Sequence, residues 1–197
     1  MKKLIILFIA GILSAFSMDA QVIFRLSAGG VPGLMASTSQ DFVLDRPQTL
    51  NGIYGDLYVL DSCSPSYQLE VSKTLRERIL VGVSLSIANG TGFKRGVNNV
   101  NNLYKKRVHN YSLMASAKYY YYNGGDFYLY GGAALGLGYS HAEIIFQRTY
   151  QTANRMLAEY ELTPIGMNYG PGRIGFFVEG VVGSVVNGVR IGVKYRY

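Results

Sequence analysis

The chain has 197 residues, of which 24 are glycine and 17 tyrosine, with one cysteine and a formal net charge of +7. Hydrophobic residues make up 49% and charged residues 16%, a composition too apolar and too weakly charged for a disordered chain. A single cysteine excludes a disulfide framework and a cysteine-rich zinc site. Beyond the N-terminus, no stretch approaches the roughly 18–20 apolar residues of a membrane-spanning helix.

The first 20 residues are typical of a secretory signal peptide. Two lysines precede the apolar run 4–17, which is short for a membrane span, and small and polar residues follow it. We expect cleavage after Ala20 or after Ser17; the alternative is a retained anchor or a buried helix. The remaining residues, 21–197, show no break in composition and are interpreted as one domain.

Alternation of apolar with small or polar residues dominates the predicted mature chain and indicates strands with two different faces. In the run 79–87 every odd position is Ile, Val or Leu, whereas positions 82, 84 and 86 are Gly or Ser. The predicted strands, in chain order, cover approximately 22–30, 66–75, 79–88, 110–122, 127–140, 160–169, 174–183 and 188–197. Pro164 interrupts the alternation of its strand and predicts a bulge there.

The predicted connections alternate in length. Tight turns are expected at 76–78, 123–126 and 170–173, and a short loop near 184–187. Long polar loops are expected at 31–65, 89–109 and 141–159. The sequence therefore predicts an all-β protein, an eight-stranded antiparallel up-and-down transmembrane β-barrel with short periplasmic turns and long extracellular loops.

The tyrosines predict which face meets the lipid. Aromatic residues at the long-loop ends are Tyr67, Tyr111, Tyr139 and Tyr160, and those at the turn ends are Tyr119, Tyr121, Phe127, Tyr169, Tyr195 and Tyr197. The segment from Tyr111 to Tyr121 corresponds to about 33 Å of strand, or roughly 24 Å of height at the usual tilt. That height matches the apolar band of outer-membrane barrels, which has an aromatic girdle at each interface. Small residues then face the narrow interior, which large apolar side chains would crowd.

The final nine residues, Val-Arg-Ile-Gly-Val-Lys-Tyr-Arg-Tyr, alternate and end in an aromatic residue. Together with the signal-peptide pattern, the eight strands and the girdle spacing, they resemble the small outer-membrane β-barrel proteins of Gram-negative bacteria, of the OmpX/OmpA-barrel type. The resemblance covers the whole mature chain and implies residence in the outer membrane. It also implies that Val193, Tyr195 and Tyr197 form the signal that the barrel-assembly machinery reads.

Strand parity places charged residues of both signs in the lumen, where ions must pair because an isolated buried charge is costly. These residues are Arg25, Glu70, Lys118, Glu179, Arg190 and Lys194. Glu179 is expected diagonally across from both Arg190 and Lys194. We interpret this set as a structural network rather than a selectivity filter, since eight strands leave little room for water.

His109 and His141 fall at strand ends, and Ser140 adjoins His141. Some lipid A-modifying barrels use a Ser–His pair, but adjacent strand residues point to opposite faces and cannot exchange a proton. A cross-strand partner such as Ser112 or Ser116 stays open. We predict no catalytic residue, no metal and no cofactor.

The predicted 89–109 loop is basic: its charged residues are Lys94, Arg95, Lys105, Lys106 and Arg107. Such a rim could hold lipopolysaccharide phosphates by charge-assisted hydrogen bonds, or be only a solvated loop. Nucleic-acid binding is not expected for an exported chain without a recognised module. The sequence favours a monomeric, non-enzymatic outer-membrane barrel for envelope integrity or surface interaction. The alternatives are a lipid A-modifying enzyme and a secreted soluble barrel that binds an apolar ligand.

Overall fold

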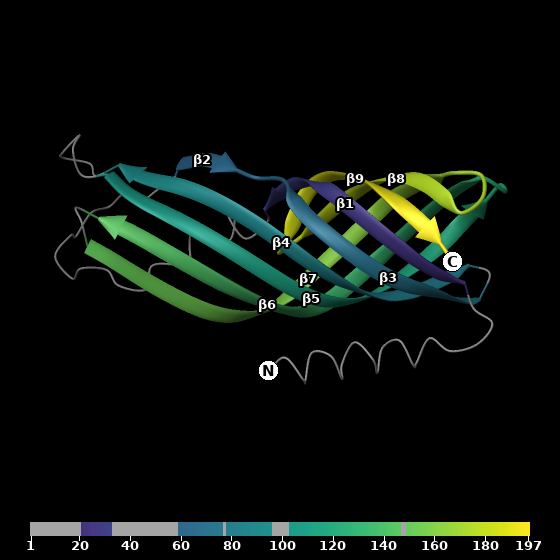
Figure 1. Cartoon of the computed structure of the whole chain (residues 1–197), viewed down its shortest axis with the longest axis horizontal. Coiled ribbons are helices and arrows are strands. Elements are labelled where there is room, and N and C mark those ends of the chain that lie inside the picture. Colours follow the sequence, from purple (N-terminus) through teal and green to yellow (C-terminus); the bar gives the residue numbers. More distant parts are fainter. Residues whose placement is uncertain (1–20, 33–58, 77, 96–102, 147–148) are drawn as a thin grey trace.

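The computed structural model describes residues 21–32, 59–76, 78–95, 103–146 and 149–197 (Figure 1). The predicted signal peptide and most of the predicted 31–65 loop lie outside these residues. Every described element is a strand, and none of the described residues forms a helix long and apolar enough to cross a membrane. The strands are β1 Val22–Pro32, β2 Val59–Cys63, β3 Ser66–Arg76, β4 Ile79–Arg95, β5 Leu103–Asn123, β6 Phe127–Phe146, β7 Thr149–Tyr169, β8 Ile174–Gly183 and β9 Val186–Arg196.

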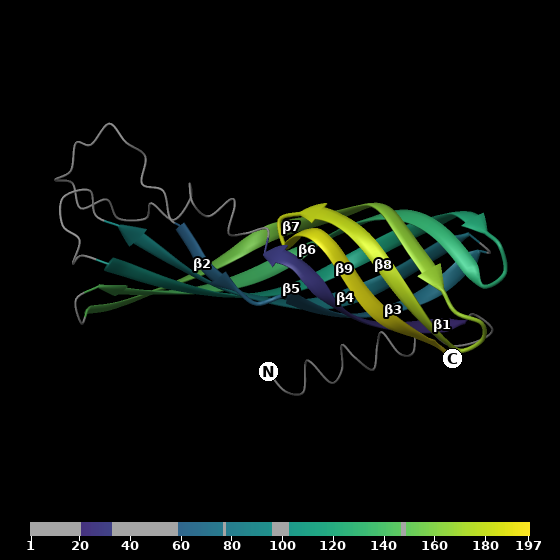
Figure 2. The ribbon, with the colours of Figure 1, turned by 90° about the horizontal axis from the view of Figure 1, so that it is seen from above.

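Eight of the strands close into a ring. Each of β3 to β8 pairs antiparallel with the next strand in the chain, and β1 completes the circle by pairing with both β3 and β9 (Figures 1 and 2). β2 lies outside the ring and pairs with the C-terminal part of β4, from Gly90 to Phe93. This confirms the predicted eight-stranded antiparallel up-and-down barrel. Closure satisfies the backbone hydrogen bonds along the wall without leaving a sheet edge.

The connections at one end are tight. The turn from Asn123 to Phe127 contains Gly125, and the turn from Tyr169 to Ile174 contains Gly172, both with positive φ (81° and 88°). Only glycine adopts these angles without strain, so the turn residues singled out in the sequence determine where these hairpins reverse.

At the other end the strands are longer than predicted. β5, β6 and β7 have 21, 20 and 21 residues, whereas β8, β9 and β1 have 10, 11 and 11. β4 to β7 therefore extend past the ring as a sheet (Figures 1 and 2). The predicted loops 89–109 and 141–159 were wrong in this respect, because most of their residues are strand. The apolar alternation stops there, but backbone pairing continues without it.

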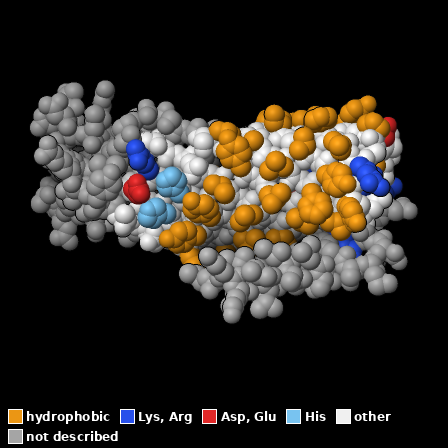
Figure 3. All heavy atoms as spheres, in the orientation of Figure 1, with side chains coloured by type: hydrophobic (Ala, Val, Ile, Leu, Met, Phe, Trp, Pro, Cys, Tyr) orange, Lys and Arg blue, Asp and Glu red, His pale blue; other side chains and the backbone are white. Residues whose placement is uncertain are grey.

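The barrel is polar inside and apolar outside. Leu85, Leu135 and Ile191 are 49%, 69% and 59% exposed, whereas Ser72, Glu179 and Arg190 are 0%, 1% and 1% exposed. Figure 3 shows the apolar side chains spread as a belt over the wall. Leu80, Met114 and Tyr130 are inward exceptions. The predicted orientation of the alternating faces is confirmed.

Both sets of predicted girdle residues lie on the exterior. Tyr111 and Tyr139 are 45% and 43% exposed near the end from which the sheet extends, and Tyr119 and Tyr169 are 50% and 58% exposed near the turns. Their rings are thus available to the two interfaces of an apolar layer.

The predicted irregularity at Pro164 is present. The pairing of β7 with β8 shifts between Leu162 and Ile165, and the pairing of β6 with β7 shifts between Tyr130 and Gly132. The bulge changes which residues of β7 face inward, so Glu161 is buried although simple alternation from the end of the strand does not place it inside.

Candidate functional site

The best-defined cluster of polar side chains crosses the lumen and is centred on Glu179 of β8. Its Oε2 accepts from Arg190 Nε at 3.0 Å and Nη2 at 2.5 Å. Its Oε1 accepts from Tyr130 Oη at 2.8 Å and Lys118 Nζ at 3.0 Å, and lies 2.9 Å from Arg25 Nη1. Three strands besides β8 therefore deliver a hydrogen-bond donor to this single carboxylate, and β1 adds a cation.

Glu70 of β3 is the second acid of the cluster. Its Oε2 accepts from Lys118 Nζ at 2.6 Å and lies 3.5 Å from Arg25 Nη1, while Oε1 accepts from Ser116 Oγ at 3.3 Å. Arg25 and Glu70 lie directly opposite each other on β1 and β3. Lys118 thus bridges both acids.

Glu161 of β7 is the third acid and was not predicted. Its two oxygens accept from Arg190 Nη1 at 3.0 Å and Nη2 at 2.8 Å, a bidentate fork. Tyr130 was also missed; its hydroxyl contacts Arg25 as well as Glu179. The interrupted alternation at Tyr130 was the only signal for it.

The six charges of this cluster, which we call the lumen network, balance one another. The cations are Arg25, Lys118 and Arg190, and the acids are Glu70, Glu161 and Glu179. All are at most 5% exposed. The cost of removing an ion from water is offset only when an opposite charge lies beside it. The equal numbers of cations and acids therefore allow six ions to be buried inside one barrel.

Lys194 stands apart from the network, contrary to the prediction. It lies opposite Gly175, whereas Glu179 lies directly opposite Arg190 and not diagonal to it. Its ammonium has no hydrogen-bond partner among the described residues and sits 5.0 Å above the ring of Tyr128. The register of β8 and β9 therefore assigns Glu179 to Arg190 alone of the two predicted partners.

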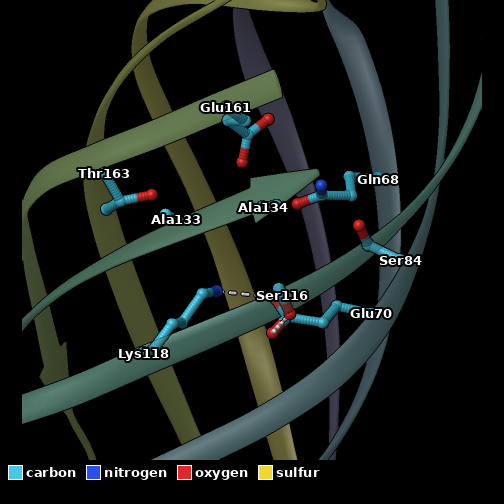
Figure 4. A pocket seen from close by; sticks show the side chains of 9 residues that line it. All are labelled: Gln68, Glu70, Ser84, Ser116, Lys118, Ala133, Ala134, Glu161 and Thr163. Atoms are coloured by element: carbon cyan, nitrogen blue, oxygen red, sulfur yellow. Dashed lines mark hydrogen bonds and ion pairs between the residues drawn. The ribbon is translucent and has the colours of Figure 1, made fainter. Parts of the chain in front are cut away.

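Little open space remains beside the network. Figure 4 shows Lys118, Glu70 and Glu161 among the side chains that line a cavity. The volume of this cavity is about 10 Å³, which is enough for a single water molecule. The contact between Arg25 of β1 and Tyr130 of β6 joins opposite sides of the ring. This part of the lumen is closed by side chains.

A carboxylate for which the described residues supply no cation lies in the lumen toward the sheet. Glu159 is 2% exposed; its Oε1 accepts from Asn110 Nδ2 at 3.0 Å, and its Oε2 has no described partner. Gly138 makes room for it, because a side chain at that position would overlap the carboxylate.

The histidines face the other way. His109 and His141 lie opposite each other on β5 and β6, and His141 is partly exposed, whereas the neighbouring Ser140 is 0% exposed. Ser112 also faces the lumen, and Ser116 donates into it. The geometry does not bring any of these serines together with a histidine.

The basic residues of the predicted rim lie on strands. β4 carries Lys94 and Arg95, and β5 carries Lys105, Lys106 and Arg107, with the two strands paired. Arg107 is exposed. Of the residues in the predicted assembly signal, Val193, Tyr195 and Tyr197 are 43%, 40% and 82% exposed on the exterior.

No family model matches the chain, and no curated protein matches it. Solved structures that it resembles include two of Ail, the attachment invasion locus protein of Yersinia pestis. The one in complex with the heparin analogue sucrose octasulfate is 12% identical over 91% of this chain and 100% of that chain, with a TM-score of 0.49. The other is 15% identical over the same shares, with a TM-score of 0.45.

The fold assignment itself rests on the strand pairing and on the polarity of the two faces. The chain has the fold of the small eight-stranded outer-membrane barrels. That is the fold implied by the resemblance noted in the sequence.

Proposed function

We propose that this chain is a monomeric, non-enzymatic protein of the bacterial outer membrane that acts through the surface it presents outside the lipid. The observation that carries the proposal is the inverted polarity: a belt of exposed aliphatic and aromatic side chains surrounds a lumen of buried ion pairs. Exposed apolar areas of this extent are matched by hydrocarbon rather than by water.

The polar lumen argues against a soluble carrier of an apolar ligand. Such a carrier needs an apolar cavity of several hundred Å³, whereas the space beside the lumen network is about 10 Å³ and is lined by Glu70, Lys118 and Glu161 among others. The same closure argues against solute passage as the main role. What remains available for recognition is the outer end of the molecule.

The sheet formed by β4 to β7 supports a role in surface interaction. It extends beyond the apolar belt, and backbone pairing from Asn89–His109 to Arg95–Leu103 orders it. A paired sheet presents side chains with less loss of conformational entropy than a free loop does. We regard envelope integrity as a further role of the same barrel.

Lipopolysaccharide is the proposed lipid partner. The two basic runs predicted as a rim, Lys94–Arg95 and Lys105–Arg107, lie on adjoining strands beyond Tyr111. Arginine and lysine bind phosphate through charge-assisted hydrogen bonds. We further propose an assembly step in which the barrel-assembly machinery reads Val193, Tyr195 and Tyr197.

Two measurements test the outer-membrane assignment together. Cell fractionation is expected to recover the chain with the outer membrane, and the unheated protein is expected to migrate differently from the heated protein on a denaturing gel. Recovery in the soluble fraction without detergent would refute the proposal. Lipid A acyl chains should be the same with the wild type and with His109→Ala or His141→Ala; a change that depends on either histidine would establish the enzyme instead.

A further inference from the structure

A row of four polar side chains crosses the outer face of the sheet next to the apolar belt. Asn89, His109, His141 and Asn154 lie directly opposite one another on β4, β5, β6 and β7. Two residues closer to the turns, the next side chains on the exterior of β5 and β6 are those of Tyr111 and Tyr139 of the girdle. Figure 3 shows the two histidines as neighbours at the edge of the belt, beside an acidic and a basic side chain.

The asparagines at the two ends of the row orient both imidazole rings. His109 Nδ1 lies 2.9 Å from Asn89 Oδ1, and His141 Nδ1 lies 2.6 Å from Asn154 Oδ1. A carbonyl oxygen only accepts, so each Nδ1 must donate its hydrogen. In each neutral ring the lone pair is then on Nε2. Histidines that bind a metal through one ring nitrogen commonly donate the hydrogen of the other nitrogen to an acceptor in this way.

His141 faces a carboxylate at a separation that suits a shared ion. Its Nε2 lies 3.6 Å from Glu143 Oε1. Two ligands bound at about 2.1 Å with a tetrahedral angle lie about 3.4 Å apart. When the ring is neutral, His141 Nε2 and Glu143 Oε1 both carry lone pairs and repel each other. A cation bound between them would attract both atoms.

His109 is the third group within reach. Its ring is stacked on that of His141 with the centroids 6.5 Å apart and the planes inclined by 22°. Among the described residues no three histidine, cysteine, aspartate or glutamate side chains already stand at metal-binding distances. Directly opposite strand residues have Cβ atoms about 5 Å apart, which places the second imidazole within reach of an ion held by His141 and Glu143.

We propose that His109, His141 and Glu143 form a site for a divalent first-row transition metal ion at the outer edge of the apolar belt. Two imidazoles and one carboxylate suit zinc and its neighbours, whereas calcium and magnesium require a set of oxygen ligands. Asn89 and Asn154 are positioning residues that hold the rings in the binding tautomer. The site shares no residue with the lumen network, and its Glu143 lies directly opposite Arg107, one of the proposed lipopolysaccharide contacts.

The test is a calorimetric titration of ZnCl₂ into the refolded full-length mature chain, free of any affinity tag, in an uncharged detergent. One zinc ion per chain is expected, with no heat from CaCl₂. His109→Gln and His141→Gln should each weaken zinc binding by more than about tenfold, and Asn154→Ala by about tenfold. Glu143→Gln should weaken it as well, whereas the matched control Asp126→Asn, in the turn between β5 and β6, should not.

A second readout separates metal binding from a change in folding. In ¹⁵N-labelled protein, zinc should shift the Nε2 resonances of both histidines and leave Nδ1 protonated. Unheated gel mobility should be the same for every variant, because these side chains contribute little to the closed barrel. Equal zinc uptake by the wild type and by the double variant His109→Gln/His141→Gln would overturn the proposal, as would a zinc shift confined to one ring.

Discussion

Buried charges are paired in the centre of the lumen and are left unpaired toward its two ends among the described residues. In the centre, three cations and three acids are all matched. Toward the sheet, Glu159 Oε2 has no described partner, and toward the turns, Lys194 Nζ has none. Glu159 and Lys194 are 2% and 1% exposed, so a charge on either is buried without the ion pairs that stabilise the charges in the centre. The comparison predicts that equal substitutions have unequal costs along the lumen axis.

The largest effect is expected at the centre. Glu179→Gln removes one negative charge from among Arg25, Lys118 and Arg190 and leaves the lumen network with an unmatched cation. The expected loss is about 3–5 kcal/mol in the free energy of unfolding, because an uncompensated buried charge is costly. Urea unfolding in lipid vesicles, followed by tyrosine fluorescence in this tryptophan-free chain, measures it.

A matched variant keeps this test specific. Glu179→Gln combined with Lys118→Gln restores the balance of charge, because Arg25 keeps Glu70 and Arg190 keeps Glu161, and it should recover part of the lost stability. If the double variant lost at least as much stability as the two single variants lose together, the charge balance would not be the reason for the network.

The outer wall offers the second comparison, between the middle of the belt and its edge. Leu135 lies between Phe127 and Tyr139 on β6 and is 69% exposed. Leu135→Arg should destabilise the barrel by about 2–4 kcal/mol, because arginine must enter the hydrocarbon. Ile174→Arg, next to a turn and 63% exposed, should cost no more than about 1 kcal/mol.

The same two variants also test the orientation of the wall itself. If the wall faced solvent, both arginines would be tolerated equally, and the difference between Leu135→Arg and Ile174→Arg would vanish. The unfolding measurement can be repeated in vesicles of different acyl-chain length. The difference between the costs of the two variants should then change with the thickness of the bilayer.

The contrast between belt and sheet also explains what could be predicted from the sequence. Between the two tyrosine levels, lipid and lumen impose opposite demands on alternate residues, so the pattern from Ile79 to Ile87 defines both the strand and its orientation. Past His109 and His141 the pattern changes: the outward positions carry Arg107 and Glu143, whereas the buried positions carry the apolar Val108 and Ala142. Alternation then loses its signal, and the strands were predicted to end at 88, 110 and 140 although their pairing continues.

Within the lumen, the residues that could be predicted are those on regular strands. Arg25, Lys118 and Arg190 follow simple parity, and the structure brings them together. Glu161 could not be placed, because the bulge at Pro164 changes the parity of β7. The partners of each charge also depend on the register between strands, which alternation within one strand does not determine.

The smallest effect is expected at the outer end of the lumen. Glu159→Gln is the same chemical change as Glu179→Gln, but it removes a carboxylate that has no described cation. The amide oxygen still accepts from Asn110 Nδ2, and the cost of burying an unmatched charge disappears. Stability should therefore change by no more than about 1 kcal/mol, in the stabilising direction. A loss as large as that of Glu179→Gln, measured in the same vesicles, would mean that Glu159 is matched by a cation after all and that the ends of the lumen are as tightly balanced as its centre.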